Sequence, residues 1–235
     1  QVLLQQAHQS AARLTALLGR PADDPDLRLI TCHLGNGCSI TAIRGGCSLD
    51  TSMGFTPLEG LLMGSRSGDL DPAIILHIMG KEELSTLEAS ALLNKHSGLL
   101  GISGLSNDMR KLLEAEAAGN DRAKLAVDVF CYRLKKYIAA YVGVLGGIDA
   151  VAFAGGIGEN AAAVRARSLL GLEVMGLRLD EARNRAARGV EAEISPEGAT
   201  ARVFVVPTDE ELLIARDTYR IVADLRSGKT PEAPA

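Results

Sequence analysis

The sequence predicts an α/β domain with a mixed β-sheet. Two patterns lead to this fold class. Near the N-terminus, three short apolar runs are separated by tight glycine turns, which is typical of antiparallel strands. In the second half, short apolar runs alternate with helical patterns, which is typical of parallel strands joined by crossover helices. A sheet with both kinds of pairing is mixed.

The first fifty residues predict one helix followed by a three-stranded meander. Residues 1–19 repeat apolar side chains at helical spacing, and a polar stretch with two prolines ends this helix. The turn Gly35-Asn36-Gly37 separates the first two strands, and Asn-Gly between apolar runs is a strong hairpin signal. The predicted strands are 27–34, 38–43 and 47–51.

Helical patterns dominate the middle of the chain. One helix begins at a capping box, in which Ser85 and Glu88 have the required spacing. The longest helix is apolar on more than one side, which fits a deep core or an interface. The helices are predicted at 71–79, 85–95, 108–118 and 121–145.

The last third returns to strand and helix alternation. Strands are predicted at 150–154 and 202–206, and a helix at 159–170. A second capping box, which begins at Thr208, predicts a final helix to about Leu225. We therefore expect one domain over residues 1–226. The polar, proline-containing tail 227–235 is expected to be flexible.

The composition argues against several classes of function. The chain has 25 basic and 29 acidic residues, and a net charge of −4 does not favour a nucleic-acid or anionic membrane partner. Aromatic residues make up only 3%, so platforms for stacked bases are not expected. The sequence has neither an 18-residue apolar run nor a signal-peptide pattern. Four cysteines without a C-x-x-C pair predict reduced thiols in a cytoplasmic protein.

Residues 50–72 form the most unusual segment. They contain too many Gly, Ser, Thr and Asp residues for one helix or strand. They are also too apolar for a solvated linker, because of Leu58, Leu61, Leu62 and Met63. The segment has a single cation, Arg66, and an unpaired buried cation costs several kcal/mol. We therefore predict a buried, irregular segment in which Arg66 pairs with an anion, either a protein carboxylate or a ligand phosphate.

Two glycine motifs could bring backbone N–H groups close to an anion. One is the strand end from His33 to Gly37, and the other is Ala154–Asn160, which joins a strand to a helix. Each also has a purely structural interpretation, as a plain hairpin and as a tight strand–helix turn. Gly156-x-Gly158 matches the dinucleotide fingerprint loosely, so an NAD-dependent oxidoreductase stays open as an alternative.

Two further motifs place carboxylates at predicted helix starts. Asp108 and Arg110 could hold a ribose or an adenine edge, although an Asp there also serves as a cap. Capping likewise explains the acidic residues after Thr208, and one of them could reach Mg²⁺ through water. Together, the motifs describe a nucleotide between two glycine turns, with an arginine and a carboxylate nearby. Phosphoryl transfer requires such an arrangement.

Five sequence blocks resemble the acetate and propionate kinase family in order and spacing. They are residues 33–37, 50–72, 98–110, 154–160 and 207–217. The resemblance implies a ribonuclease-H-like, actin-like ATPase fold. It also implies transfer of a phosphoryl group between ATP and acetate, which yields ADP and acetyl phosphate, with Mg²⁺ as cofactor. Propionate stays open as the acceptor, and a homodimer is expected.

The resemblance also implies roles for individual residues. Arg66 would stabilise the phosphoryl group in transfer, and Glu210 would help to hold Mg²⁺. The residues expected to contact the nucleotide are His33, Leu34, Gly35, Asn36, Gly37, Asp108, Met109, Arg110, Gly156, Ile157, Gly158, Glu159 and Asn160.

The sequence departs from the family in one respect. Family members have a further N-terminal domain with a Mg²⁺-site Asn, a carboxylate-binding Arg, a catalytic Asp and the His of an HGTSH block, and these 235 residues contain no counterpart. The chain thus resembles only the larger, C-terminal part. We expect it alone to bind adenine nucleotide weakly and to have little kinase activity. A non-catalytic nucleotide-binding or dimerisation fragment is the alternative.

Overall fold

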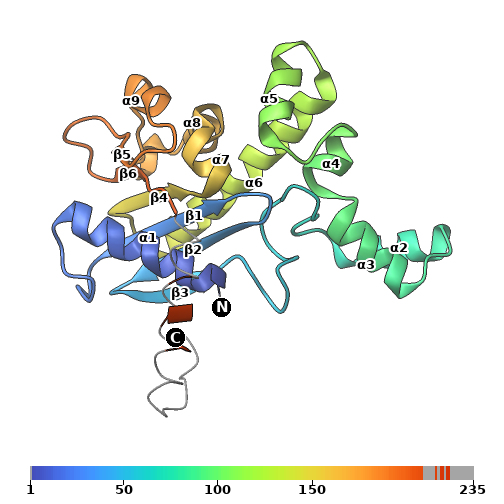
Figure 1. Cartoon of the computed structure of the whole chain (residues 1–235), viewed down its shortest axis with the longest axis horizontal. Coiled ribbons are helices and arrows are strands. Elements are labelled where there is room, and N and C mark those ends of the chain that lie inside the picture. The colour runs from blue at the N-terminus through green and yellow to red at the C-terminus, as the bar shows by residue number, and fades with distance from the viewer. Residues whose placement is uncertain (1, 209–214, 216–217, 220, 223–235) are drawn as a thin grey trace.

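The computed structural model describes residues 2–208, 215, 218–219 and 221–222, and the side chains from residue 9 onward. Its six strands form a sheet in the order β3-β2-β1-β4-β6-β5 (Figure 1). β1 pairs antiparallel with β2 and parallel with β4, and β4 pairs parallel with β6. The predicted mixed sheet is therefore confirmed. The strands are β1 Arg28–Leu34, β2 Cys38–Arg44, β3 Cys47–Thr51, β4 Ala150–Ala154, β5 Ala192–Glu193 and β6 Arg202–Val205.

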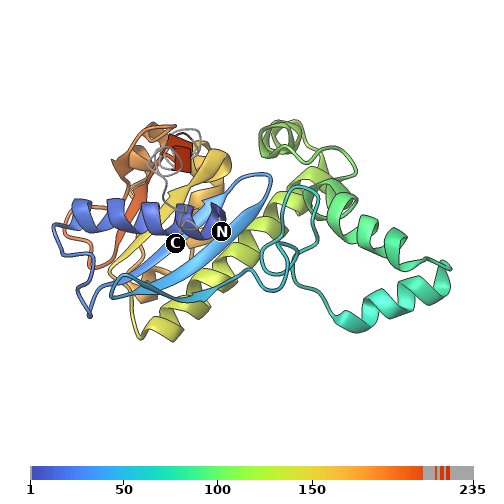
Figure 2. The ribbon, with the colours of Figure 1, turned by 60° about the horizontal axis from the view of Figure 1, so that its bottom comes forward.

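Helices cover both faces of the sheet. The described helices are α1 Val2–Leu18, α2 Pro72–Lys81, α3 Thr86–Lys95, α4 Gly98–Ser103, α5 Met109–Ala117, α6 Asp121–Leu145, α7 Gly155–Asn160, α8 Ala162–Leu169 and α9 Glu181–Ala186, with a 3-10 turn at Glu173–Met175. Figure 2 shows α1 in front of the strands and α6 crossing behind them. No described helix has both the length and the hydropathy that a membrane span requires.

Alternation along β1 divides the core between the two faces. Leu29 packs in a cluster with Leu14 of α1, whereas Ile30 belongs to a larger cluster with Phe130 and Leu134 of α6. Successive strand residues point to opposite faces, so a strand covered on both sides is apolar throughout. The long predicted helix is therefore a core helix over much of its length. The segments that follow strands β1 and β4 are described in the next subsection.

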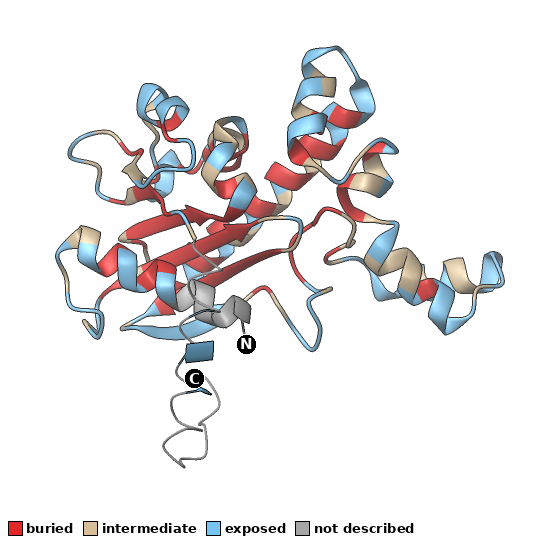
Figure 3. Ribbon diagram, in the orientation of Figure 1, coloured by how far each residue is buried: buried red, intermediate tan, exposed pale blue. Residues whose placement is uncertain are grey.

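The α2–α3 pair projects away from the sheet (Figure 1). Figure 3 shows it almost entirely in the colours of exposed and intermediate residues. No residue of α2 is buried, although the helix is rich in Ile, Leu and Met. The Leu76 side chain is 73% exposed. An exposed apolar helix of this kind is available for contact with another surface.

Several predicted elements differ in the structure. The helix expected at 159–170 is two helices, α7 and α8, separated at Ala161 by a non-helical backbone (φ −97°, ψ 79°). The segment 98–103, which carried no helix prediction, forms α4, and α9 and β5 were not predicted. Most of the predicted final helix lies outside the described residues. The residues of it that are described after 208, namely 215, 218–219 and 221–222, are helical.

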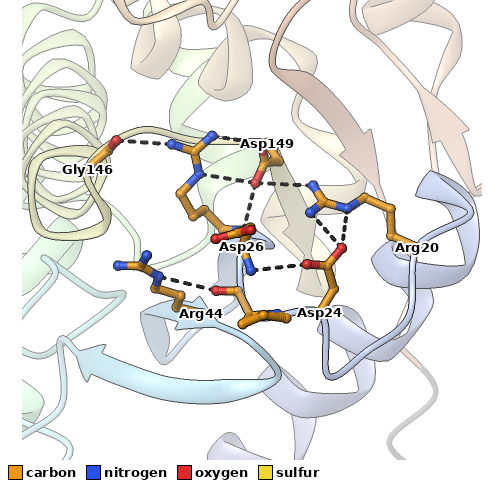
Figure 4. A network of polar contacts seen from close by, with 8 residues as sticks. Arg20, Asp24, Asp26, Arg44, Gly146 and Asp149 are labelled. Atoms are coloured by element: carbon orange, nitrogen blue, oxygen red, sulfur yellow. Dashed lines mark hydrogen bonds and ion pairs between the residues drawn. The ribbon is translucent and has the colours of Figure 1, made fainter.

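An ion-pair network joins the starts of β1 and β4 (Figure 4). Asp149 accepts hydrogen bonds from the Arg28 backbone N–H at 2.8 Å and from Arg28 Nη2 at 3.0 Å. Arg20 Nη1 lies 3.7 Å from Asp149 Oδ2, and Arg20 Nη2 lies 2.7 Å from Asp24 Oδ2. The network thus ties the α1–β1 connection to the α6–β4 connection.

Replacing Asp149 by Asn is expected to lower the free energy of unfolding by about 1–3 kcal/mol at pH 7. Burial alone would raise the pKa of Asp149, but the hydrogen bonds and charge of Arg28 outweigh this and hold the pKa below its ordinary value. A carboxylate with a depressed pKa contributes stability above its unfolded-state pKa and loses it as the pH falls through the folded-state pKa. Urea unfolding should therefore show a wild-type advantage at pH 7 that shrinks below about pH 4.

The matched control is Glu181→Gln, which removes an exposed pair with Arg185. Exposed i,i+4 pairs contribute little, so this variant should unfold like the wild type. Equal stability of Asp149→Asn and wild type at pH 7 would contradict the role given to the network.

Candidate functional site

A cavity of about 690 Å³ opens where three distant segments meet. They are the β1–β2 turn, the start of α5 and the region from α7 to the start of α8. The lining residues are Gly35, Asn36, Asn107, Asp108, Met109, Arg110, Leu113, Gly156, Ile157, Asn160 and Ala161. Three of the motifs identified in the sequence thus face one cavity. In Figure 1, α5 and α7 both lie above the sheet.

The cavity has an apolar part and a polar part. Met109, Leu113, Ile157 and Ala161 supply apolar surface. Asparagines from all three segments, together with Asp108 and Arg110, supply polar groups. Apolar walls with a few converging polar groups are typical of small-molecule sites. The arrangement suits a flat apolar ring with polar substituents.

The β1–β2 turn is fixed against two other segments. The Asn36 Oδ1 atom accepts a hydrogen bond from Asn107 Nδ2 at 3.1 Å, and the Asn36 carbonyl accepts one from the Gly64 N–H at 2.9 Å. A Cβ at Gly64 would lie 2.0 Å from Asn36 Oδ1 and 3.2 Å from the Asn36 carbonyl oxygen, so the two segments approach each other closely here. The turn is therefore held in one position relative to α5 and to the segment that carries Arg66.

Asp108 caps α5 and pairs with Arg110. Its carboxylate accepts hydrogen bonds from the Arg110 N–H at 2.9 Å and from Arg110 Nη2 at 2.8 Å. These hydrogen bonds, first that from the side chain, hold the pKa of Asp108 below its ordinary value. The capping interpretation of Asp108 is therefore confirmed. The same residue presents a fixed negative charge to the cavity.

The glycine motif after β4 is itself a short helix, α7, whereas we predicted a tight turn that leads from the strand into a helix beginning at Glu159. Gly155, at φ +73°, begins α7, and a Cβ at this position would lie 2.8 Å from the Leu34 carbonyl oxygen. This close approach seats α7 against the end of β1. Asn160 Nδ2 donates to the Gly156 carbonyl at 3.0 Å within the helix. The tertiary contact thus overrides the low helix propensity of glycine.

The other predicted nucleotide residues lie around the cavity but do not line it. His33 and Leu34 are buried in β1, and Gly158 is buried in α7. Glu159 Oε1 accepts hydrogen bonds from the Thr208 N–H at 3.0 Å and from Thr208 Oγ1 at 3.2 Å. Gly37 lies next to Arg66, since a Cβ on Gly37 would be 3.3 Å from Arg66 Nη1.

Arg66 is half-buried in a segment without regular structure. Residues 52–71 contain no helix or strand, which confirms the predicted irregularity. The prediction of burial is only partly right: Leu61, Leu62 and Met63 are buried, but Phe55 is fully exposed. Within the described part of the chain, Arg66 forms no ion pair, and its Nη1 atom lies 3.4 Å from the Pro57 carbonyl oxygen.

One buried cation was missed by the sequence reasoning. Arg165 on α8 is completely buried and donates hydrogen bonds to Gly158 of α7 and to Asn184 and Ala187 at the end of α9. The only sign of this burial in the sequence is that Arg165 lies four residues before Leu169, on the apolar side of α8. Three lining residues, Asn107, Leu113 and Ala161, were also missed, although each is close to a predicted motif.

Residues 7–216 match the model of the Acetokinase family. The chain belongs to this family. It is 58% identical over 207 residues to an acetate kinase from Heliobacterium modesticaldum, which covers 88% of this chain and 51% of that protein. It is 55% identical over 212 residues to an acetate kinase from Methanosarcina thermophila, which covers 90% and 51%. The chain thus spans about half the length of the curated relatives it matches.

Solved structures of this family share the fold. An acetate kinase from Porphyromonas gingivalis superposes with a TM-score of 0.85 at 46% identity and covers 90% of this chain and 53% of that chain. A propionate kinase from Francisella tularensis gives a TM-score of 0.82 at 40% identity with the same coverage. The predicted family and α/β fold class are therefore confirmed.

The predicted metal ligand, Glu210, lies outside the described residues. Among the residues that are described, no three His, Cys, Asp or Glu side chains gather as a metal site.

Proposed function

We propose that this chain is the nucleotide-binding half of a phosphotransferase that uses ATP and a short-chain carboxylate. The reaction would convert ATP and acetate to ADP and acetyl phosphate. The observation that carries the proposal is the meeting of the β1–β2 turn, the α5 start and α7 in one cavity. The names of the similar acetate kinases support the same reaction.

In this proposal the cavity orients the nucleotide. The adenine ring would lie against the apolar side chains of Met109, Leu113 and Ile157, next to the polar groups of Asp108 and Arg110. The phosphates would extend along the Gly35–Gly37 turn toward Arg66, because Arg66 lies beside Gly37. Glycines allow such a close approach of the backbone to phosphate.

The proposed chemistry is direct, in-line phosphoryl transfer. A carboxylate oxygen attacks the γ-phosphorus, and the bond from that phosphorus to the β,γ-bridging oxygen breaks. Arg66 would stabilise the charge on the transferring group, and no proton transfer is needed. Mg²⁺, with Glu210 as a proposed ligand, would neutralise phosphate charge when bound. Acetate is the proposed acceptor, and the similarity to a propionate kinase leaves propionate as a second one.

We include a homodimer and a cytoplasmic location in the proposal. The dimer is supported by α2, whose apolar side chains such as Ile74 and Leu76 are exposed in the single chain. The family membership argues against the NAD-dependent oxidoreductase. A non-catalytic nucleotide-binding fragment differs from the main proposal only in activity, so activity has to be measured separately from binding.

Ligand-dependent thermal stability tests the proposal. A ligand that binds only the folded state raises the melting temperature with its concentration. ATP should stabilise the 235-residue chain and NAD should not. A hydroxamate assay for acetyl phosphate should find little turnover by this chain alone. Stabilisation by NAD but not by ATP would contradict the proposed site.

Gly156→Gln is expected to weaken ATP binding about tenfold or more. Gly156 lines the cavity, and a Cβ there meets no atom within 4 Å, so a larger side chain is expected to extend into the cavity. Loss of one well-filled part of a site costs about 1–3 kcal/mol, and 1.4 kcal/mol is tenfold in affinity. Isothermal titration calorimetry with ATP measures the effect.

Gly143→Gln is the matched control for this variant. Gly143 is an exposed residue of α6 with equally free space at its Cβ position, but it does not line the cavity. ATP affinity should stay at the wild-type value there. An unchanged ATP affinity in Gly156→Gln would place the nucleotide elsewhere.

A further inference from the structure

Asp69 closes the loop that carries Arg66. The Gly60 N–H donates to Asp69 Oδ1 at 2.7 Å, and the Asp69 N–H donates to the Gly60 carbonyl at 3.0 Å. These two hydrogen bonds join the ends of residues 60–69, which we call the Arg66 loop. We call the joined ends, Gly60 and Asp69, the base of the loop. The position of Arg66 therefore depends on how this base is held.

Glycines make the folded form of the Arg66 loop possible. Gly60 has φ +102°, and a Cβ there would lie 2.2 Å from the Ser52 carbonyl oxygen. Gly68 has φ +67°, and a Cβ there would lie 2.4 Å from the Leu61 carbonyl oxygen. Backbone packs against backbone at both ends of the loop. The loop is thus built for one compact conformation.

Helix α6 anchors the base of the loop. The Tyr137 hydroxyl donates to Asp69 Oδ2 at 2.6 Å, and Arg133 Nη2 donates to the Asp69 carbonyl. Burial, and then the hydrogen bond to Asp69, raise the pKa of Tyr137, so its hydroxyl remains protonated as a donor. Arg133 and Tyr137 lie about one turn apart on α6, and this helix packs in the core through residues such as Leu134. The loop base is therefore fixed to the central helix.

The Arg66 loop also touches the edge of the cavity. The Gly64 N–H donates to Asn36, a lining residue, and Arg66 Nη1 lies beside Gly37 in the same turn. Neither Asp69 nor Tyr137 lines the cavity. A change at the loop base can thus move Arg66 and leave the apolar walls in place.

We propose that Asp69 and Tyr137 are positioning residues that hold Arg66 at the phosphate end of the nucleotide cavity. The inference rests on the proposed function, because it needs a nucleotide whose phosphates reach Arg66. Loss of the Tyr137–Asp69 hydrogen bond should free the Arg66 loop. The contribution of Arg66 to binding of the phosphates should then fall, whereas binding of the nucleoside should not.

The experiment compares the dissociation constants of ATP and adenosine for the 235-residue chain. Tyr137→Phe should weaken ATP binding about tenfold, as expected for loss of a charge-assisted hydrogen bond, and leave adenosine binding unchanged. Asp69→Ala should have at least the same effect. Asp69→Asn should rescue part of it, since the Asn oxygen can still accept from Gly60. Tyr132→Phe, the same change at a 63% exposed tyrosine of α6, is the control.

Hydrogen exchange of residues 61–68 gives an independent readout. Exchange should be faster in Tyr137→Phe and unchanged in Tyr132→Phe, with both variants folded by circular dichroism. Equal loss of ATP and adenosine binding, or wild-type exchange of the loop in Tyr137→Phe, overturns the positioning role. A wild-type chain that binds neither ligand contradicts the proposed function itself, and exchange then decides whether Asp69 and Tyr137 hold the loop.

Discussion

Replacement of Arg66 by alanine is expected to slow phosphoryl transfer by about 10³–10⁵-fold in a polypeptide that also supplies the acceptor side. Arg66 lies beside Gly37 at the end of the cavity where the phosphates are proposed to extend, and no described carboxylate pairs with it. Its charge therefore lies where it can act on the transferring group. The hydroxamate assay measures the loss, which should appear in kcat more than in the KM for ATP, since the cavity walls remain intact.

Two further variants sharpen the test of Arg66. Arg66→Lys keeps the positive charge but loses the planar, two-pronged geometry, so it should recover only a small part of the rate. Arg185→Ala removes an exposed surface arginine on α9 and should leave the rate unchanged. An Arg66→Ala variant that keeps more than a tenth of wild-type kcat would contradict the role of Arg66.

Arg165→Ala is expected to have the largest effect on stability, with a loss of about 3–5 kcal/mol in the free energy of unfolding. The Arg165 guanidinium is fully buried and donates to Asn184 Oδ1 at 2.7 Å and to three backbone carbonyls at 2.7–2.8 Å. Burial, and then the charge of Arg188, lower the pKa of Arg165 to about 10, so it is still charged at neutral pH. Its removal leaves buried acceptors without this donor, and an unsatisfied buried acceptor is destabilising.

Urea unfolding of Arg165→Ala at pH 7 measures this effect. Arg167→Ala is the matched control, because Arg167 lies on the same helix but is partly exposed and pairs with Glu116. It should cost about 1 kcal/mol or less. If Arg165→Ala were as stable as Arg167→Ala, the link that Arg165 forms between α7 and α9 would contribute nothing to the stability of the fold.

Local patterns predicted the regular parts of the fold. Apolar runs and the Asn-Gly turn located β1 and β2, and the capping box of α3 is present, with Ser85 Oγ accepting from the Glu88 N–H at 3.3 Å. The helix α7 could not be predicted in this way. Glycine disfavours helices, and α7 depends on a contact with Leu34 that lies 121 residues earlier in the chain.

The sequence predicted the motifs of the site, but it did not predict how they are arranged in space. The sequence identified Asn36, Asp108 and Gly156, and the cavity unites them. Their distances from one another depend on the sheet order, in which β1 lies between β2 and β4. Glu159 also belongs to a predicted motif, but it does not line the cavity. Its carboxylate instead accepts a hydrogen bond from Thr208. Arg165 was missed because a buried arginine with neutral partners has no distinctive local sequence.

Hydrogen exchange of the 235-residue chain with and without ATP tests the central claim most directly. The claim is that one nucleotide contacts the β1–β2 turn, the start of α5 and α7 at the same time. ATP should slow exchange in residues 35–37, 107–113 and 156–161 together, and Gly156→Gln should reduce this protection at the same ATP concentration. Protection that appears elsewhere, or in only one of the three segments, would contradict the claim.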